Sequence, residues 1–295
     1  MPDTNPARPA SSAKPGGSEL ALRTTSALLL SLLAAGSAYV GGWAFIAFWG
    51  LAAILVFWEW TTLVAAADRR AVLVAGSASI VLAVVLAGAA DSSTTGVHAT
   101  RLLAALTLLG MGMLGTTVLA HRKQRIWVAG GVACAGALAI APIVLRSDVH
   151  YGFLAELFLF AIIWTTDILA YFVGRALGGP KLAPSISPNK TWSGAIGGTT
   201  AGVAAAAGIA LAADLSPIGV IAVVAAALSI IGQAGDLFES ALKRRFGAKD
   251  SSRFIPGHGG LMDRLDSFLA AAVLAALIGI GRGGLEAPGR GLLVW

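Results

Sequence analysis

The sequence predicts an all-α, polytopic integral membrane protein with about nine transmembrane helices. Of its 295 residues, 57% are hydrophobic and only 12% are charged. The mean hydropathy is +0.80, and several separate apolar stretches reach the roughly 20 residues that cross a bilayer. Soluble domains usually contain about 25% charged residues, so an unusually apolar soluble enzyme is disfavoured.

The predicted helices are the apolar stretches that lie between charged residues. They are expected at 24–40, 43–62, 71–90, 102–120, 126–145, 153–173, 194–213, 217–235 and 265–281. No stretch between them could hold a soluble domain, so residues 21–295 are expected to form a single membrane-embedded domain. Its two main polar interruptions are a loop at 174–193 and a longer segment at 236–264.

The N-terminal residues 1–20 are rich in Pro, Ser, Ala and Gly. Such a segment cannot bury a core, and it is predicted to be a disordered cytoplasmic tail. A cleaved signal peptide is the alternative, and the length of the polar region disfavours it. The sole cysteine, Cys134, lies inside an apolar stretch, which excludes an intrachain disulfide and a cysteine-built metal site.

The positive charges predict the orientation. With nine spans and a cytoplasmic N-terminus, 17 of the 21 Lys and Arg residues fall on the inside, and only Arg101, Arg146, Arg282 and Arg290 fall outside. Because cytoplasmic loops carry an excess of Lys and Arg, this split favours that orientation. The segment at 236–264 is therefore expected to face the cytoplasm, where nucleotides are available.

Two short stretches share a pattern of carboxylates. "DLFES" begins at Asp236 and "DRLDS" begins at Asp263, and each has a second carboxylate three residues later, at Glu239 and Asp266. On a helix these positions share one face, so four carboxylates could converge at a site for Mg²⁺ or another hard cation. The alternative for the second stretch is that Asp263 caps the last helix.

Basic residues and glycines separate the two stretches. The glycines Gly257, Gly259 and Gly260 allow backbone N–H groups to approach phosphate oxygens. A triphosphate bound to the metal ion explains both the basic residues and the glycines. A basic patch that contacts anionic lipid does not explain the aspartates between them. The basic residues are Lys243, Arg244, Arg245, Lys249 and Arg253.

The loop at 174–193 is a second candidate anion site on the same face. Ser187, Lys190 and Thr191 precede a predicted helix start, although "SPN" is also ordinary turn chemistry. Asp167 lies deep in the sixth predicted span, where a carboxylate is a functional candidate by default; a structural hydrogen bond is the alternative. Glu59 and Glu156 also lie in spans, but no neighbour in the sequence indicates a partner for either.

The stretch "SALKRRFGAKDSSRFIPGHGGLMDRLD", residues 240–266, resembles the signature of the phosphatidate cytidylyltransferases. "SPNKTW" resembles the second motif of that family, and "WTTDILAYFVGRALG" fits as well, so the resemblance covers the catalytic part at 164–267. Ser193 departs from the pattern, which has Glu or Gln after the tryptophan. Only the contact made at that position is put in doubt.

The resemblance implies the transfer of CMP from CTP to phosphatidate, with Mg²⁺ and a second cation such as K⁺. Asp236 and Asp263 are the first candidate metal ligands, followed by Asp266 and Glu239. His258 is expected to position the loop and not to act as a base. The other expected catalytic residues are Lys243, Lys249 and Arg264. The expected substrate-binding residues are Asp167, Ser187, Lys190, Thr191, Ser240, Arg244, Asp250, Gly257, Gly259 and Gly260.

The expected partners are CTP, phosphatidate and membrane lipid, with no nucleic acid, and the resemblance suggests a homodimer. The expected location is a bacterial-type inner or plasma membrane, with the active site facing the cytoplasm. A CTP-dependent polyprenol or phytol kinase is the nearest alternative, because it would attack the γ-phosphorus with a similar fold. A transporter of an anionic substrate is an alternative from another class, and the inverted repeats typical of that class are not found in the sequence.

Overall fold

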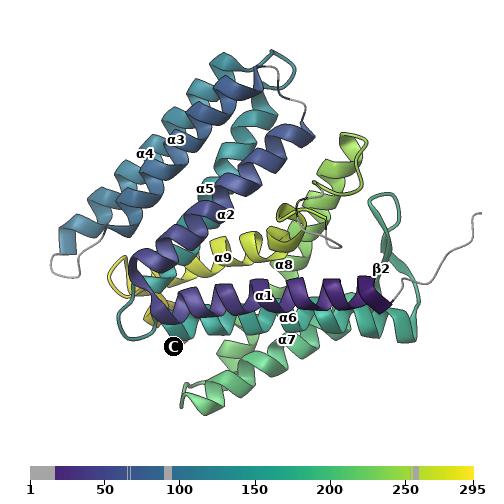
Figure 1. Ribbon diagram of the computed structural model, residues 1–295. Coiled ribbons are helices and arrows are strands. Elements are labelled where there is room, and N and C mark those ends of the chain that lie inside the picture. Colours follow the sequence, from purple (N-terminus) through teal and green to yellow (C-terminus); the bar gives the residue numbers. More distant parts are fainter. Residues whose placement is uncertain (1–16, 65, 67, 90–94, 253, 255–258) are drawn as a thin grey trace, which may run out of the picture.

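The structure is a computed structural model that describes residues 17–64, 66, 68–89, 95–252, 254 and 259–295. It is almost entirely helical, which confirms the predicted fold class (Figure 1). The helices are α1 Gly17–Val40, α2 Gly42–Leu63, α3 Arg69–Gly88, α4 Thr95–Leu119, α5 Arg125–Arg146, α6 Gly152–Leu177, α7 Trp192–Ala212, α8 Ile218–Arg245, α9 Met262–Gly283 and α10 Pro288–Leu293.

Nine of these helices follow the predicted order, and eight described helices, α2 to α9, are long and apolar enough to span a membrane. The apolar part of α1, Thr25–Val40, is shorter. The short helix α10 was not predicted. Within the predicted loop at 174–193 the chain forms an antiparallel hairpin of β1 Lys181–Ala183 and β2 Ser187–Thr191, which was also not predicted.

The predicted end of the eighth helix at residue 235 was wrong, because α8 continues to Arg245. Its last turns are polar but suit a helix. Ser240 Oγ lies 3.4 Å from Asp236 Oδ1, and Lys243 Nζ lies 2.6 Å from Glu239 Oε2, four residues before it. Positive side chains in the final turn also interact favourably with the helix dipole. "DLFES" therefore extends beyond the apolar part of α8 without leaving the helix.

The helices form two groups that meet along α5 and α9 (Figure 1). Helices α2 to α5 pack side by side in the first group, and α6 to α9 form the second. Aromatic rings join them: Trp49 of α2 stacks on Phe268 of α9 with ring centroids 4.6 Å apart, and Phe160 of α6 lies 5.5 Å from Phe268. These rings hold α2 against the helices that carry the signature residues.

Helix α7 packs closely on α6 through small residues. Every fourth position of α7 on its buried face is glycine or alanine, and this spacing lets two helix backbones approach each other. The buried residues are Gly194, Gly198, Gly202, Ala206 and Ala210. A Cβ atom at Gly198 would lie 2.6 Å from the carbonyl oxygen of Thr166, so α6 is fixed against α7 next to Asp167.

Candidate active site

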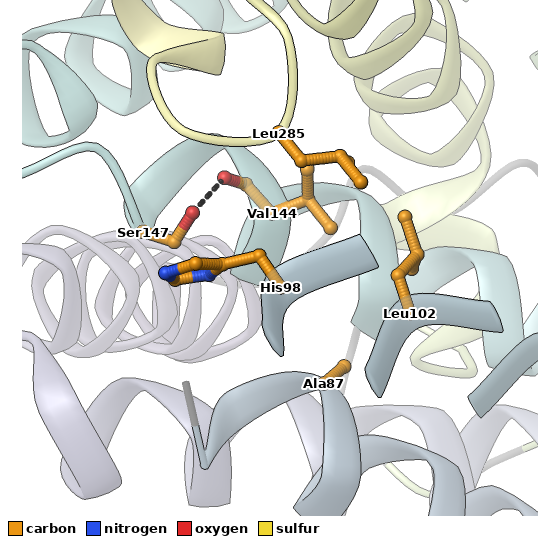
Figure 2. Close-up of a pocket in the computed structure, with 6 residues that line it drawn as sticks. All are labelled: Ala87, His98, Leu102, Val144, Ser147 and Leu285. Atoms are coloured by element: carbon orange, nitrogen blue, oxygen red, sulfur yellow. Dashed lines mark hydrogen bonds between the residues drawn. The ribbon is translucent and has the colours of Figure 1, made fainter. Parts of the chain in front are cut away.

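Two cavities lie at opposite ends of α9. The small one, beside Val144, Ser147 and Leu285 (Figure 2), has a volume of about 20 Å³ and is close to the size of one water molecule. The large one has a volume of about 1130 Å³ and reaches the start of α9, where Asp263 and Asp266 lie. Of these two cavities in the described part of the chain, the large one can accommodate a nucleotide or a lipid.

The large cavity has a polar end and an apolar end. Its polar end contains nine of the residues predicted from the sequence: Asp167, Lys190, Thr191, Asp236, Lys243, Asp250, Asp263, Arg264 and Asp266. Its apolar end is formed by α1, α2 and α6, and includes Leu30, Phe48, Trp49, Leu55, Phe160 and Trp164. The cavity is thus suited to a molecule with a charged head and an apolar body.

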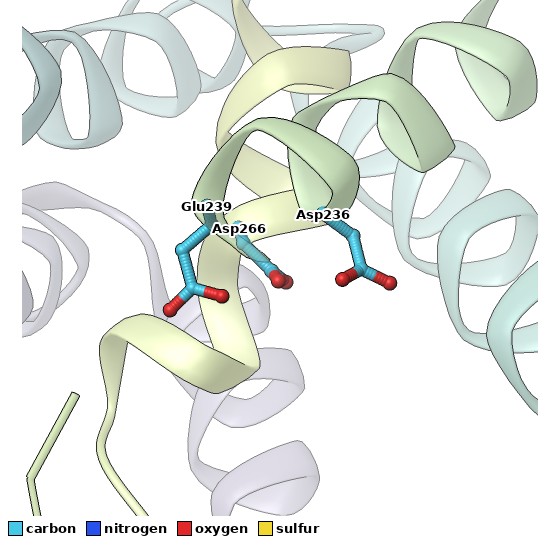
Figure 3. Close-up of side chains that lie close together, drawn as sticks. All are labelled: Asp236, Glu239 and Asp266. Carbon is cyan, nitrogen blue, oxygen red and sulfur yellow. The ribbon is translucent and has the colours of Figure 1, made fainter. Parts of the chain in front are cut away.

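Three carboxylates converge at the polar end (Figure 3). Asp236 and Glu239 of α8 and Asp266 of α9 each offer one oxygen, and these oxygens lie within 4.8 Å of one another. Glu239 is buried, and its Oε1 atom has no hydrogen-bond partner among the described residues. Three hard oxygen donors, one of them buried and unsatisfied, fit a hard divalent cation such as Mg²⁺.

A glycine brings the two helices together at this cluster. A Cβ atom at Gly235 would lie only 2.7 Å from the carbonyl oxygen of Asp266, so the backbone of α8 contacts that of α9 there. The next residue of α8 is Asp236. The close approach therefore places the carboxylates of Asp236 and Asp266 side by side.

Asp263, a first-choice metal ligand from the sequence, is not part of this cluster. Its oxygens accept hydrogen bonds from Ser251 N at 3.1 Å and Gly260 N at 2.9 Å, and Oδ1 lies 2.6 Å from Lys243 Nζ. Lys243 also lies 2.6 Å from Glu239 Oε2. Asp263 thus binds the loop between α8 and α9, and Lys243 links it to the carboxylate cluster.

The hairpin contributes a cation to the cluster. Lys190 of β2 forms an ion pair with Asp236, and both side chains are about a quarter to a third exposed, 26% and 31%. Thr191 caps α7 by accepting a hydrogen bond from Gly194 N at 3.1 Å. Arg244 Nε donates to the carbonyl oxygen of Ile186 at 3.3 Å, which ties the hairpin to α8.

The departure at Ser193 has a local explanation. Its hydroxyl donates to the carbonyl oxygen of Gly178 and lies 3.0 Å from Thr191 Oγ1. The residue therefore closes the hairpin onto the end of α6.

The other predicted residues that the structure describes do not line the cavity. Ser240 contacts Asp236, and Lys249 is exposed. Gly260 donates its N–H to Asp263, so this N–H is engaged within the protein. The others outside the lining are Ser187, Glu239, Arg244 and Gly259. Gly257 and His258 lie outside the described residues.

Sequence reasoning left out Glu59, which the structure places beside Asp263. Its side chain is 1% exposed and accepts hydrogen bonds from the loop and from the start of α9. A glutamate within a predicted span was the available signal. Its partners are about 200 residues further along the chain, so nothing near Glu59 in the sequence could identify them.

Comparisons with known proteins identify the family of this chain. The sequence model described as "Cytidylyltransferase family" matches residues 21–280. The phosphatidate cytidylyltransferase of Brucella abortus biovar 1 (strain 9-941) is 42% identical over 267 residues, covering 89% of this chain and 94% of that protein. The phosphatidate cytidylyltransferase of Bacillus subtilis (strain 168) is 46% identical over 128 residues, covering 43% of this chain and 48% of that protein. The resemblance seen in the signature is confirmed, and the chain belongs to the cytidylyltransferase family.

Proposed function

We propose that this integral membrane protein transfers CMP from CTP to phosphatidate and forms CDP-diacylglycerol and pyrophosphate. The observation that carries the proposal is the large cavity, whose polar end holds the signature carboxylates and cations while its apolar end is formed by α1, α2 and α6. A triphosphate and a lipid phosphate suit the polar end, and acyl chains suit the apolar end. The relatives named phosphatidate cytidylyltransferase support this assignment.

The reaction requires positioning and charge neutralisation. An oxygen of the phosphatidate phosphate forms a bond to the α-phosphorus of CTP, and the bond from that phosphorus to the β-phosphate oxygen breaks as pyrophosphate leaves. A phosphate monoester with a second pKa of about 6 is mostly dianionic at neutral pH, so the attacking oxygen needs no general base. Aligning the two phosphates then provides most of the rate enhancement.

Charged side chains around the cavity would bind the two anions. We assign Lys190 and Arg264 to phosphate groups, because both line the cavity beside the carboxylates. Thr191 and Asp167 also line it and can contribute polar contacts to the lipid or nucleotide phosphate. Lys249 is exposed on the loop after α8, and we assign it to the leaving pyrophosphate on the family resemblance alone.

Asp236, Glu239 and Asp266 would hold Mg²⁺, since they supply the converging hard oxygen atoms. When bound, the ion would offset the negative charge of the phosphates. A second cation such as K⁺ is proposed on the family resemblance alone.

We place the active site on the cytoplasmic side of a bacterial inner or plasma membrane. The distribution of Lys and Arg supports this orientation. Single cysteines at the exposed positions Ser185 and Lys249, in a Cys134→Ala background, should react with an impermeant reagent only in inside-out vesicles. A homodimer is proposed on the family resemblance alone, and cross-linking in native membranes tests it.

CTP labelled separately on its α- and γ-phosphorus tests the proposed reaction. Purified protein given CTP, phosphatidate and Mg²⁺ should transfer only the α-label to lipid, and thin-layer chromatography should identify the product as CDP-diacylglycerol. Transfer of the γ-label would instead identify a CTP-dependent lipid kinase. Transfer of neither label by folded protein would contradict both assignments.

A further inference from the structure

Glu59 occupies an unusual position for a buried membrane carboxylate, because donor groups surround both of its oxygens. Oε1 lies 2.6 Å from Ser252 Oγ and 2.9 Å from Leu261 N, and Oε2 lies 3.1 Å from Ser251 Oγ and 2.7 Å from Met262 N. A carboxylate has about four lone-pair sites. Ser252 and the N–H groups of Leu261 and Met262 donate to three of them, and the Ser251 hydroxyl, which also contacts Asp263, can donate to the fourth. Glu59 is therefore fully engaged as an acceptor within the protein.

Glu59 also provides hydrogen-bond acceptors for the N–H groups at the start of α9. The first N–H groups of a helix have no partner within the helix, and Leu261, which precedes α9, provides no side-chain cap. Glu59 accepts the N–H groups of Leu261 and Met262 from another helix, α2. A negative charge at a helix N-terminus is stabilising, so α9 is capped by a residue from the other helix group.

Glu59 and Asp263 hold the loop together. The hydroxyl of Ser251 lies 3.1 Å from both Glu59 Oε2 and Asp263 Oδ2, and Asp263 also accepts the N–H of Gly260. Asp263 lies beside Lys243, which contacts Glu239 of the carboxylate cluster. A continuous series of polar contacts thus connects Glu59 to the cluster.

The glycine at position 260 fits this arrangement. A Cβ atom there would lie 2.7 Å from each oxygen of Glu59 and would collide with the hydroxyl of Ser251. Only a residue without a side chain leaves room for the carboxylate. The close approach of Glu59 and Ser251 thus explains the second glycine of the "GG" in the signature, Gly260.

Resting on the proposed function, we propose that the loop between α8 and α9 binds CTP and that Glu59 is a positioning residue for this loop. Asp250, Phe254, Asp263 and Arg264 line the cavity, whereas Glu59 does not. Glu59 acts through Ser251, Ser252 and the start of α9, and it fixes the orientation of those cavity-lining side chains toward the triphosphate.

Glu59→Gln tests the proposal, because an amide offers one acceptor oxygen and turns an NH₂ group toward two donors. Amide hydrogen–deuterium exchange in the peptide containing Leu261 and Met262 should become at least tenfold faster. The KM for CTP should rise about tenfold or more, and the KM for phosphatidate should change less than threefold. Glu59→Asp, which keeps the charge, should lie between the parent and Glu59→Gln in both measurements.

Glu156→Gln is the matched control. Glu156 is equally buried, but it lies on α6 and neither oxygen has a hydrogen-bond partner among the described residues. The control should leave the loop exchange and both KM values unchanged. If Glu59→Gln behaves like this control, or exchanges faster without any change in the KM for CTP, the positioning role is wrong.

Gly260→Ala disturbs the same contact from the loop side. It provides a second test of the proposal if Glu59→Gln fails to fold. Its effect on the KM for CTP should be large in the parent and clearly smaller in a Glu59→Ala, Ser251→Ala background, where the added methyl group meets neither the carboxylate nor the hydroxyl. Equal effects in the two backgrounds would contradict the proposal. If the parent forms no CDP-diacylglycerol, the proposed function fails, while the exchange measurement still tests the hold of Glu59 on the loop.

Discussion

The stretches "DLFES" and "DRLDS" contain the same pattern of residue types, yet their first aspartates have different partners. Asp236 lies within α8, is partly exposed and pairs with Lys190. Asp263 lies in the first turn of α9, has a side chain that is only 8% exposed, and accepts N–H groups of the loop. Inside a helix the backbone N–H groups are already bonded, whereas at a helix start they are free. Position within the helix, more than sequence pattern, therefore separates a candidate metal ligand from a loop anchor.

The largest expected effect concerns the carboxylate cluster. Asp236→Asn and Asp266→Asn should each reduce CDP-diacylglycerol formation on the order of a thousandfold or more, because they remove charge that holds the cation. Thermal stability without Mg²⁺ should be equal or higher for Asp266→Asn, since three nearby carboxylates repel one another. Activity across a Mg²⁺ titration and thermal denaturation provide the two measurements. Parental activity in both variants at ordinary Mg²⁺ would show that the cluster is structural.

Asp263→Asn should differ from Asp236→Asn, because it should lower the stability of the protein. The change removes one of the two carboxylate charges beside Lys243, which keeps Glu239 as a partner. It also weakens the acceptor for Ser251 and Gly260, and the loss of a buried hydrogen-bond partner costs about 1–3 kcal/mol. The melting temperature should fall by several degrees, and added Mg²⁺ should not restore activity. Asp214→Asn, at an exposed position with φ of 53°, is the control and should be neutral. A stable Asp263→Asn protein rescued by Mg²⁺ would make Asp263 a metal ligand after all.

Lys190→Gln should have the smallest effect on stability and activity of these variants. It tests whether Lys190 competes with the metal ion for Asp236. Breaking a partly exposed ion pair should change stability by less than about 1 kcal/mol. At saturating substrates, the Mg²⁺ concentration for half-maximal activity should fall, because Asp236 loses its competing cation. The KM for at least one substrate should rise about tenfold. Lys123→Gln, at an exposed position between α4 and α5, should change neither quantity.

The sequence was sufficient for the helices and for most of the polar end of the cavity. Hydropathy gave nine helices in order. The two carboxylate stretches supplied Asp236, Asp263 and Asp266, the signature supplied Arg264, and the structure brings these four residues to one cavity. These predictions succeed because span length and i, i+3 spacing are local properties.

Contacts between distant parts of the chain could not be predicted. The N–H group of Gly260 was expected to face phosphate, but it is donated to Asp263, because two carboxylates converge on the loop. The partners of Glu59 follow it by 192 to 203 residues. The hairpin was also missed, because "SPNKT" has turn residues and only five positions in its strand.

The contact between α2 and α9 has a consequence for biosynthesis. Translation proceeds at about 5–20 residues per second, so Glu59 emerges from the ribosome roughly 10 to 40 seconds before Leu261 and Met262 do. During that interval the second span contains Glu59, but the N–H groups that it will accept have not yet been synthesised. Chains interrupted before α9 would keep this carboxylate in the membrane without the N–H groups of Leu261 and Met262. The start of α9 thus completes the hydrogen bonding of a carboxylate that was synthesised about 200 residues earlier.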